Sequence, residues 1–586
     1  MAHKLWRLTI PWFKTYSIFH YPNLLYDPAV FFKKYVPMNI ENTNISYQKE
    51  FISKYGAVYT PGKLADFVGH LLIAYAKKCK IDVSFIIDPA CGEGALLNAI
   101  SVYSPNAKLI GIDIDKSVIN FMSGYAYAEI ADFICPKDSN TQYSANYWLA
   151  KLPPIDAIIA NPPWSSERLY VKHILQEKGF SLVNGQYDSY ELFIELGISI
   201  LREGGLFAFI IPDSLFAPEK VNLRKYLLEN TELKVVARLG EKLFPGVFRA
   251  ASVIIGRKAK PTTSSRTCCY RLDTIARDSF LNGKLDLYDH FLKNNHYVIQ
   301  KRFCNNPLFN IDVDTKSEDS SIINCISKGN LTLGDLFVFG RGVEISKNGL
   351  VVICKNCKSS QGIRHFQDNS VFICKSCHEQ QYINSNVVKF IVEKKQAIGY
   401  SQMWVGESIG RYTLTMPRFI KMDVSGIDYK SPDLFNAPKL LVRKTGLGIY
   451  AAIDLSNALT SQTVYILKPK SKLSMEALYF YLAFVNSRII YYYYQKMYGA
   501  TEWKSHPYLT KKIIFSLPVP LYKNVQSDNE IANLSMILSQ KYERNLDLKL
   551  EYLIATRYDL KNAQLETIKS QMEKLPPLSS ILNMSF

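Results

Sequence analysis

The chain has 586 residues with a hydrophobic fraction of 48%, a charged fraction of 21% and a formal net charge of +18. This composition is that of an ordinary globular protein with roughly three to four domains, and the positive charge favours an anionic partner such as nucleic acid. No apolar run is long enough for a membrane-spanning helix, and the amino terminus lacks a signal-peptide pattern. The 11 cysteines are too sparse for a disulfide framework, which excludes a small secreted scaffold.

Short β-rich runs alternate with helical stretches between residues 49 and 262. The expected strands are 83–88, 107–115, 128–134, 156–160, 205–212 and 233–239. The expected helices are 93–103, 116–125, 190–205 and 219–230. Such alternation predicts an α/β fold with a doubly wound, mainly parallel sheet, whose ligands bind beyond the carboxyl ends of the strands. The residues expected along that edge are Asp88, Asp113, Asp132, Asn161 and Pro212.

The remainder of the chain divides by composition. Residues 263–330 are polar and weakly patterned, and we expect a connector there. Residues 331–523 are richer in Gly, Tyr and Lys and form a second expected domain of mixed α+β structure. A charged helical tail is expected over 524–586 and a short N-terminal extension over 1–48. From these patterns we expect no internal repeat and no low-complexity tract.

The first expected strand is followed by a glycine-rich turn, DPACGEGALL, which begins at Asp88. Gly92 and Gly94 allow the backbone to approach a ligand closely, and the start of the next helix offers free N–H groups. The turn lacks the Gly-x-Gly-x-x-Gly pattern of dinucleotide sites and the Gly-Lys-Ser/Thr triplet of phosphate loops. By itself it gives weak support for any one ligand.

Two acidic residues stand at the ends of the next two expected strands. Asp113 lies about 20 residues beyond the turn, where a carboxylate can accept both hydroxyls of a ribose. Asp132 can accept from an adenine amino group while Phe133 covers the ring. Each acid alone is explained equally well as a strand-end cap. Together they describe a nucleoside bound without a phosphate cradle, which is what S-adenosylmethionine requires.

The fourth expected strand ends in Asn-Pro-Pro-Trp at residues 161–164. Two prolines cannot continue a strand. A pattern of this kind arises by chance in roughly a few per cent of chains of this length. The segment can therefore also be a strand terminator with one packed aromatic residue and no catalytic role.

Five segments occur in one order: YGAVYTPGKLADFVGHLL, DPACGEGALL, GIDID, ADFI and NPPW. In this order and spacing the chain resembles the gamma class of adenine-N6 DNA methyltransferases, the TaqI-like enzymes of restriction–modification systems. The resemblance implies a Rossmann-like catalytic domain over 49–262 and a target-recognition domain over 331–523. Two residues depart from the family pattern: Leu96 stands where Phe is common, and Trp164 replaces the usual Tyr or Phe.

The resemblance also implies which residues hold the cofactor. The methionine part of S-adenosylmethionine is assigned to Thr60, Pro61, Asp88, Ala90, Gly92 and Gly94. The ribose is assigned to Asp113, and the adenine to Asp132 and Phe133. Asn161 borders the cofactor as well as the target base.

The resemblance gives the proline pair a chemical purpose. The amino nitrogen of adenine is a poor nucleophile because its lone pair is delocalised into the ring. If the Asn161 side-chain oxygen and the Pro162 carbonyl accept both amino hydrogens, the nitrogen is aimed at the methyl group, and Pro163 keeps the loop rigid. Trp164 is expected to stack on a base swung out of the duplex. Phe244 is a candidate for the opposite face of that base and, equally, for a core aromatic.

Two cysteine pairs, Cys354 with Cys357 and Cys374 with Cys377, are separated by 16 residues. This spacing is that of a four-thiolate zinc site, which is closed and therefore structural rather than catalytic. We expect a zinc ribbon over 351–380. The sequence leaves open whether the Lys and Arg residues of the ribbon contact DNA or the ribbon is purely architectural.

The expected function is site-specific methylation of adenine N6 in double-stranded DNA, by the modification enzyme of a restriction or phage-defence system. Because about 48 residues precede the expected catalytic domain, we expect a stand-alone enzyme with a separate restriction endonuclease or defence-system subunit as candidate partner. We expect it in the cytoplasm of a prokaryotic cell, associated with the nucleoid and not with a membrane. The alternatives are an RNA adenine or DNA cytosine-N4 methyltransferase and a DNA-recognition subunit with a vestigial cofactor pocket.

Overall fold

The computed structural model describes residues 58–118, 123–137, 143–164, 170–185, 187–247, 249–363, 367–446, 448–499 and 509–573. The chain divides into two units, Met1–Lys54 and Tyr55–Phe586. The expected N-terminal extension, 1–48, lies outside the described residues. All described residues belong to the second unit.

A nine-stranded sheet has the order β3-β2-β1-β4-β5-β7-β6-β8-β9. The first five strands in the chain are β1 (Phe85–Asp88), β2 (Lys108–Asp113), β3 (Tyr127–Ile130), β4 (Ile155–Ala160) and β5 (Leu201–Pro212). These five strands run parallel to one another. β7 (Ala251–Arg257) is antiparallel to both β5 and β6 (Glu232–Gly240). β8 (Arg266–Arg271) is parallel to β6, and β9 (His296–Ile299) ends the sheet antiparallel to β8.

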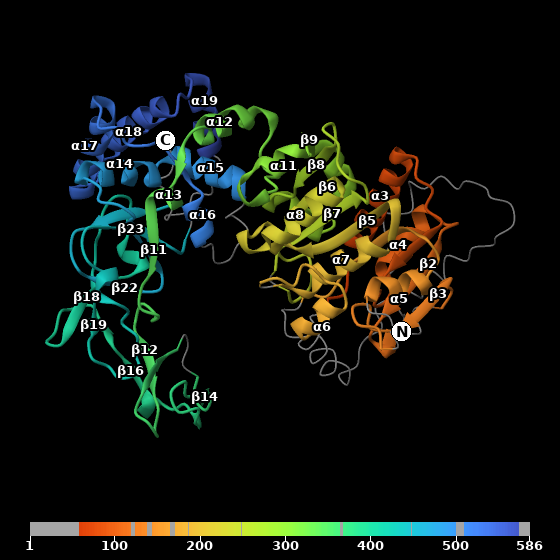
Figure 1. Cartoon of the computed structure of the whole chain (residues 1–586), viewed down its shortest axis with the longest axis horizontal. Coiled ribbons are helices and arrows are strands. Elements are labelled where there is room, and N and C mark those ends of the chain that lie inside the picture. The colour runs from red at the N-terminus through yellow and green to blue at the C-terminus, as the bar shows by residue number, and fades with distance from the viewer. Residues whose placement is uncertain are drawn as a thin grey trace, which may run out of the picture. The chain divides into compact units, whose positions relative to one another are not determined.

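Helices flank this sheet (Figure 1). They are α3 (Gly62–Cys79), α4 (Ala95–Tyr103), α5 (Ser144–Lys151), α6 (Lys172–Glu177), α7 (Ser189–Ile200), α8 (Val221–Asn230), α9 (Thr274–Leu281), α10 (Leu287–Asn294) and α11 (Lys301–Asn305). α3 packs against α4 and α10, while α5 packs against α7. The inner strands β4 and β7 are buried along almost their whole length, because both faces of the sheet are covered.

The predicted α/β fold is confirmed, and the expected strands correspond to β1–β6. The strand expected over 128–134 ends early, at Ile130. The Asp132 carboxylate accepts the N–H groups of Ile134 and Cys135 at 2.9 and 3.1 Å. These hydrogen bonds turn the chain away from the sheet.

The helix expected over 190–205 is shorter in the structure. It ends at Ile200, and β5 begins at the next residue. The ammonium group of Lys258 donates to the carbonyls of Ser199 and Leu201 at 3.1 and 2.7 Å. These bonds satisfy carbonyl groups that a helix end leaves without backbone partners.

Residues 263–330, expected as a connector, contribute β8 and β9 to the sheet. The run Thr267–Tyr270 is fully buried between β6 and β9. Its polar flanks hide this short buried run, which is why the sequence pattern there is weak. The domain boundaries themselves stay predictions.

Two four-stranded sheets, a two-stranded sheet of β10 (Leu331–Thr332) and β24 (Pro518–Val519), a small ribbon and a layer of helices make up the C-terminal part, as expected of a mixed α+β region. The first sheet has the order β11 (Phe337–Arg341), β23 (Val464–Pro469), β20 (Lys439–Arg443) and β21 (Ala451–Asp454). The second has the order β17 (Val392–Glu393), β19 (Arg418–Lys421), β18 (Tyr400–Trp404) and β22 (Leu459–Thr460). The helices are α12 (Ser317–Ser327), α13 (Leu333–Leu336), α14 (Met475–Asn486), α15 (Arg488–Tyr498), α16 (Lys511–Phe515), α17 (Gln526–Gln540), α18 (Arg544–Arg557) and α19 (Asn562–Met572). Within the described part of the chain, no helix has the length and apolar character needed to cross a membrane.

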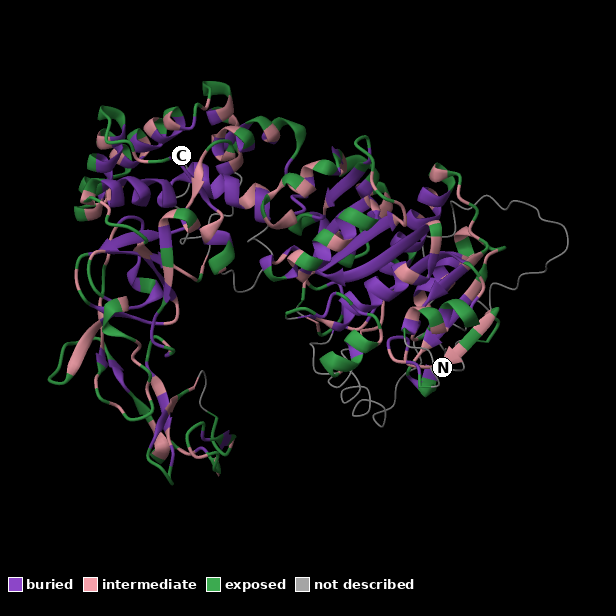
Figure 2. Ribbon diagram, in the orientation of Figure 1, coloured by how far each residue is buried: buried purple, intermediate pink, exposed green. Residues whose placement is uncertain are grey.

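Two large cores account for most of the buried side chains (Figure 2). One extends along the chain from Leu64 to Val313 and the other from Ile322 to Met572. The tyrosine run Tyr491–Tyr494 lies in the second core. The change from one core to the other therefore falls after β9 and before α12.

Four charged side chains join α18 to the rest of the C-terminal part. Arg411 and Arg488 contact Asp547 and Glu551, and all four side chains are 0–1% exposed. Asp547 lies 2.8 Å from Arg411 and 2.9 Å from Arg488. Two positive and two negative charges balance in this cluster, so it is stable only while all four are present.

Replacement of Arg488 by methionine leaves two buried carboxylates with one cation. We expect a loss of about 3–5 kcal/mol in the free energy of unfolding, measured by urea denaturation. Lys549→Met is the matched control on α18, the helix that carries the two carboxylates of the cluster, because Lys549 and Glu530 form an exposed pair at 3.0 Å. Such a pair contributes about 0–1 kcal/mol. Equal stability of the two variants would contradict the role given to the buried cluster.

Candidate active site and metal centre

The carboxyl edge of the parallel strands gathers the polar residues expected there. Asp88 ends β1, Asp113 ends β2, and Asn161 follows β4 directly. A pocket opens at this edge. Its lining contains the predicted residues Thr60, Asp88, Ala90, Gly92 and Asn161, together with Val58, Tyr59, Cys91, Glu93, Ala95 and Leu96. Open α/β sheets bind their ligands at this place.

The glycine-rich turn is fixed by carboxylates from two neighbouring strands. Asp88 accepts the N–H of Ala90 at 3.0 Å, and Asp113 accepts the N–H of Gly92 at 2.7 Å. Gly92 and Gly94 have φ angles of 49° and 78°, in the left-handed region that favours glycine. The shape of the turn therefore depends on the hydrogen bonds to Asp88 and Asp113 and on the two glycines.

Burial raises the pKa of both carboxyl groups. For Asp88 burial is the largest effect, the N–H of Ala90 opposes it, and the charge of Asp113 adds to it. For Asp113 burial again dominates, although the N–H groups of Asp115 and Gly92 lower the pKa. A ligand that brings hydrogen-bond donors or positive charge would stabilise the ionised form of both groups.

The side-chain amide of Asn161 is held at its nitrogen. The nitrogen donates to the carbonyl of Val58 at 2.8 Å and to the hydroxyl of Thr60 at 3.1 Å. Pro61, the next residue, is the N-cap of α3 and anchors this segment to the helix. The Asn161 oxygen is buried and has no hydrogen-bond partner among the described residues. A buried acceptor without a partner costs about 1–3 kcal/mol, so a ligand that donates to it is favoured.

Side chains hold the loop after β4, because Pro162 and Pro163 have no N–H. The Ser189 hydroxyl donates to the carbonyl of Pro163, and the Arg249 guanidinium donates to the carbonyl of Trp164 at 2.7 Å. Neither Ser189 nor Arg249 is expected from the sequence. Their partners lie 26 and 85 residues away in the chain, and no local pattern indicates such contacts.

Trp164 and Phe244 lie together, but their rings are not parallel. The ring centroids are 5.1 Å apart and the ring planes meet at 80°. Both side chains are buried. A base can lie between the two rings only after they separate. In this structure Phe244 is thus a core aromatic in edge contact with Trp164.

Asp132 and Phe133 follow β3 and serve the local packing. Two backbone N–H groups of the following turn and the Tyr170 hydroxyl all donate to Oδ1 of Asp132. The Phe133 ring is 2% exposed and stacks with Trp148 and Phe193, with centroid distances of 5.5 Å to each. Its ring therefore belongs to the core, and Oδ2 of Asp132 is the atom with acceptor capacity left for a ligand.

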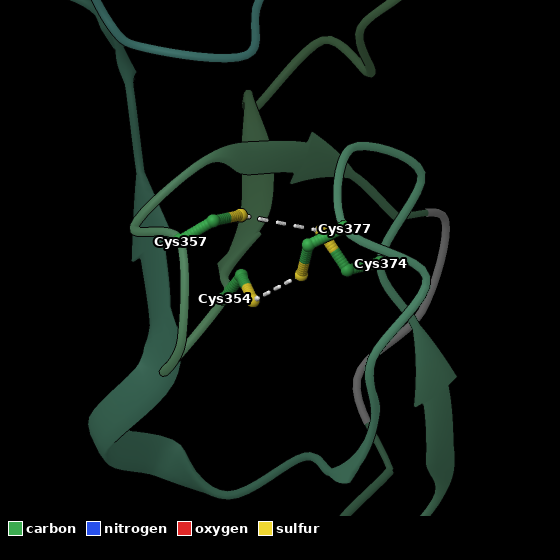
Figure 3. A group of neighbouring side chains, drawn as sticks. All are labelled: Cys354, Cys357, Cys374 and Cys377. Atoms are coloured by element: carbon green, nitrogen blue, oxygen red, sulfur yellow. Dashed lines mark hydrogen bonds between the residues drawn. The ribbon is translucent and has the colours of Figure 1, made fainter.

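The four cysteines expected to bind zinc meet in one cluster, shown in Figure 3. All four sulfur atoms lie within 4.8 Å of one another, and the pairs Cys354–Cys377 and Cys357–Cys374 are 3.6 Å apart. Four thiolates at about 2.3 Å from a tetrahedral zinc ion lie roughly 3.8 Å from each other, so the cluster fits zinc. The Gln381 amide donates to the Cys354 sulfur at 3.0 Å, an outer contact typical of metal-bound thiolates.

The ribbon around this cluster is built from a short internal repeat. Residues 351–363 and 371–383 align at an offset of 20 residues, VVICKNCKSSQGI against VFICKSCHEQQYI. Each copy forms a hairpin: β12 (Leu350–Ile353) with β13 (Ser360–Gly362), and β14 (Val371–Ile373) with β15 (Gln380–Tyr382). β16 (Val388–Phe390) adds to the first hairpin. The expectation of no internal repeat is therefore wrong, since two short copies give little periodic signal in a long chain.

Two parts of the chain match known protein families. Residues 110–244 match the Eco57I restriction-modification methylase family, and residues 401–519 match the TaqI-like C-terminal specificity domain. One segment of the chain is thus similar to an Eco57I-type methylase and another to a TaqI-like specificity domain. The first match includes Asp113 and the Asn-Pro-Pro-Trp loop, and the second begins after the four-cysteine ribbon. The resemblance expected from the sequence motifs is confirmed.

Similar curated proteins are methyltransferases of restriction–modification systems. The Type II methyltransferase M.BanIII of Aneurinibacillus aneurinilyticus is 32% identical over 224 residues, which are 35% of this chain and 38% of that protein. The Type II methyltransferase M.TthHB8I of Thermus thermophilus is 27% identical over 183 residues, 30% of this chain and 39% of that protein. This chain thus spans about two fifths of the length of these relatives.

Solved structures with a similar arrangement include two Type ISP restriction-modification enzymes. LlaBIII, ATP-dependent and bound to DNA, has a TM-score of 0.48 at 13% identity, over 84% of this chain and 40% of that chain. A nuclease-deletion mutant of LlaGI in complex with a DNA substrate mimic has the same TM-score at 14% identity, over 86% of this chain and 49% of that chain. The fold described above is assigned from the strand order of the nine-stranded sheet and not from these similarities.

Gly94, the N-cap residue of α4, has no room for a side chain. A Cβ atom there would lie 2.2 Å from the Tyr125 hydroxyl, and φ is 78°. Gly94→Ala should therefore distort the turn and weaken S-adenosylmethionine binding about tenfold or more in calorimetry. Gly62→Ala is the matched control, because no atom lies within 4 Å of the added carbon. Wild-type affinity of Gly94→Ala would argue against a cofactor at this turn.

Loss of one thiolate should open the metal site. We expect Cys374→Ser to reduce the zinc content from one ion per chain and to unfold the second hairpin, whose small core includes Cys374 itself. Hydrogen exchange of the ribbon and zinc analysis measure both effects. Cofactor binding should stay near the wild-type value, because the pocket belongs to another core. Cys268→Ser, at a cysteine outside the cluster, is the control for zinc content; full zinc content in Cys374→Ser would refute the four-cysteine site.

Proposed function

We propose that the chain is a site-specific DNA methyltransferase that transfers the methyl group of S-adenosylmethionine to N6 of adenine in double-stranded DNA. The Asn161 oxygen carries the proposal, because it is a buried acceptor at the pocket without a protein partner among the described residues. An amino group is a donor that fits this acceptor. The match of residues 110–244 to a restriction-modification methylase supports the same class of reaction.

The pocket suits the cofactor in its pattern of acceptors. Asp88 and Thr60 border the space assigned to the methionine part, and both can accept hydrogen bonds from its ammonium group. One carboxylate oxygen of Asp113 accepts the N–H of Gly92 and the other accepts the N–H of Asp115. Each oxygen can accept one further hydrogen bond, from a ribose hydroxyl. When bound, S-adenosylmethionine supplies a methyl group activated by the positive sulfur.

Hydrogen bonds to the target amino group are the proposed source of catalysis. Asn161 Oδ1 accepts one amino hydrogen and the Pro162 carbonyl accepts the other, which localises the lone pair on nitrogen. The bound cofactor would supply its methyl group to this nitrogen and keep the sulfur electron pair, and the nitrogen would release one proton to solvent. Ser189 and Arg249 fix the next two carbonyls of the loop, which limits the rotation of the Pro162 carbonyl.

Trp164 is the proposed stacking partner of the flipped adenine. In the structure, the Trp164 ring is in edge contact with Phe244. We propose that the two rings separate when DNA binds, and that the base then lies on the face of the indole.

The TaqI-like specificity domain is the proposed reader of the recognition site in double-stranded DNA. A net charge of +18 supports an anionic substrate of this kind. In the cytoplasm of a prokaryotic cell, the proposed partner is a separate restriction endonuclease or a subunit of a phage-defence system.

Asn161→Ala tests the proposal because it removes the acceptor for the amino group. We expect methyl transfer to fall by about 10²–10³-fold or more. The assay measures incorporation of labelled methyl groups into DNA of mixed sequence and identifies the modified nucleoside by mass spectrometry. Cofactor affinity should fall far less, because Asp88 and the glycine-rich turn remain, although the contact with Val58 and Thr60 is lost.

The exposed Asn230→Ala is the matched control and should transfer methyl groups at the wild-type rate. Full turnover by Asn161→Ala would exclude the proposed role of its oxygen. Methylated cytosine in the DNA, or methylation of RNA alone, would show that the substrate is not adenine in double-stranded DNA. A wild-type protein that does not bind the cofactor would indicate a vestigial pocket.

A further inference from the structure

The zinc ribbon is a separate small module within the C-terminal part. Its core consists of Val352, Cys354, Phe372, Cys374 and Ile383, and it is distinct from the main core of that part. The ribbon also lies outside both ranges that match known families. Neither the proposed methyl transfer nor the matched specificity domain therefore explains why the chain contains it.

Four exposed lysines belong to this module: Lys355, Lys358, Lys375 and Lys389. Within the described part of the chain, none of them forms an ion pair with a carboxylate. By contrast, Lys347 just before the ribbon pairs with Glu407 at 2.6 Å. The ribbon thus presents positive charge to solvent that its own structure does not neutralise.

The internal repeat fixes the places of two of these lysines. Lys355 and Lys375 each follow the first cysteine of a pair. The N–H of Lys355 donates to the Gln381 side chain at 2.8 Å, and the N–H of Lys375 donates to the Gln361 side chain at 3.1 Å. Each cysteine-bearing loop is thereby held by the opposite hairpin, and the two loops face each other in Figure 3.

Exposed apolar side chains lie on the hairpin strands on either side of the loop that contains Lys375. Val371 and Ile373 alternate on β14 and are 55% and 57% exposed. Tyr382, the partner of Val371 on β15, is 62% exposed. Unneutralised lysines beside exposed aliphatic and aromatic groups fit a nucleic-acid backbone, in which charged phosphates alternate with apolar sugars.

We propose that the lysine face, defined as Lys355, Lys358, Lys375 and Lys389, binds the phosphates of the DNA duplex that the enzyme methylates. The inference rests on the proposed function, because it takes duplex DNA as the substrate. Lysine ammonium groups bind phosphates as point charges, so the face adds affinity without reading bases. The cofactor pocket and the choice of methylated site are independent of it.

A variant with alanine at all four positions tests this face. Its affinity for a labelled duplex that the wild-type protein methylates should fall, as measured by fluorescence anisotropy at several salt concentrations. The slope of log affinity against log salt should become shallower by about 3–4, because each phosphate contact contributes about 0.9. Zinc content and the methylated sequence should both stay as in the wild type.

Two further variants separate charge from folding. Arginine at the same four positions keeps the charge and should restore binding. Alanine at Lys225, Lys541, Lys549 and Lys561, four exposed lysines outside the ribbon, removes equal charge and should leave the slope near that of the wild type. If the ribbon variant loses zinc, Lys389→Ala on β16 leaves both cysteine loops intact and should show about a quarter of the change in slope.

Wild-type affinity and slope in a ribbon variant that retains zinc would overturn the lysine face and leave the proposed function standing. An equal change in the control with four alanines outside the ribbon would also overturn it, because the effect would then be one of net charge. A wild-type protein that methylates no DNA would overturn both proposals together.

Discussion

The amide of Asn161 donates from its nitrogen to the Val58 carbonyl and the Thr60 hydroxyl, and its oxygen is buried without a partner among the described residues. This arrangement requires β4 to end at Ala160 and the segment before α3 to cross the carboxyl edge of the sheet. The two prolines after Asn161 impose the first condition, because they cannot continue a strand, and the helix that begins after Pro61 imposes the second. The proposed chemistry therefore depends on how two distant segments meet at one side chain.

The loop after β4 shows how the fold can position an acceptor without a strong base. Its two prolines remove backbone donors, so side chains from elsewhere fix its carbonyls. Ser189 comes from the start of α7, a helix buried on almost every residue, and Arg249 comes from the segment before β7. Rigid placement of acceptors in this way is the kind of preorganisation from which transfer reactions gain most.

Sequence patterns predicted what depends on local composition and spacing. The inner strands are continuous apolar runs, and the four cysteines have the spacing of a metal site, so the sequence predicted both. The sequence did not predict the run Thr267–Tyr270 as a buried strand, because the residues on either side of it are polar. An aromatic residue after a strand has the same pattern whether it faces a pocket or the core, and only the structure places Phe133 in the core. The contacts of Ser189 and Arg249 depend on the tertiary fold alone.

The central claim is that this edge of the sheet methylates adenine in a defined DNA sequence. Sequencing that detects modified bases, applied to DNA from cells that express the wild-type chain, measures this most directly. The account predicts N6-methyladenine in one sequence context, at nearly all of its occurrences, and none at those sites in cells without the protein. DNA free of methylated adenine, in cells that contain the folded protein with bound cofactor, would contradict it.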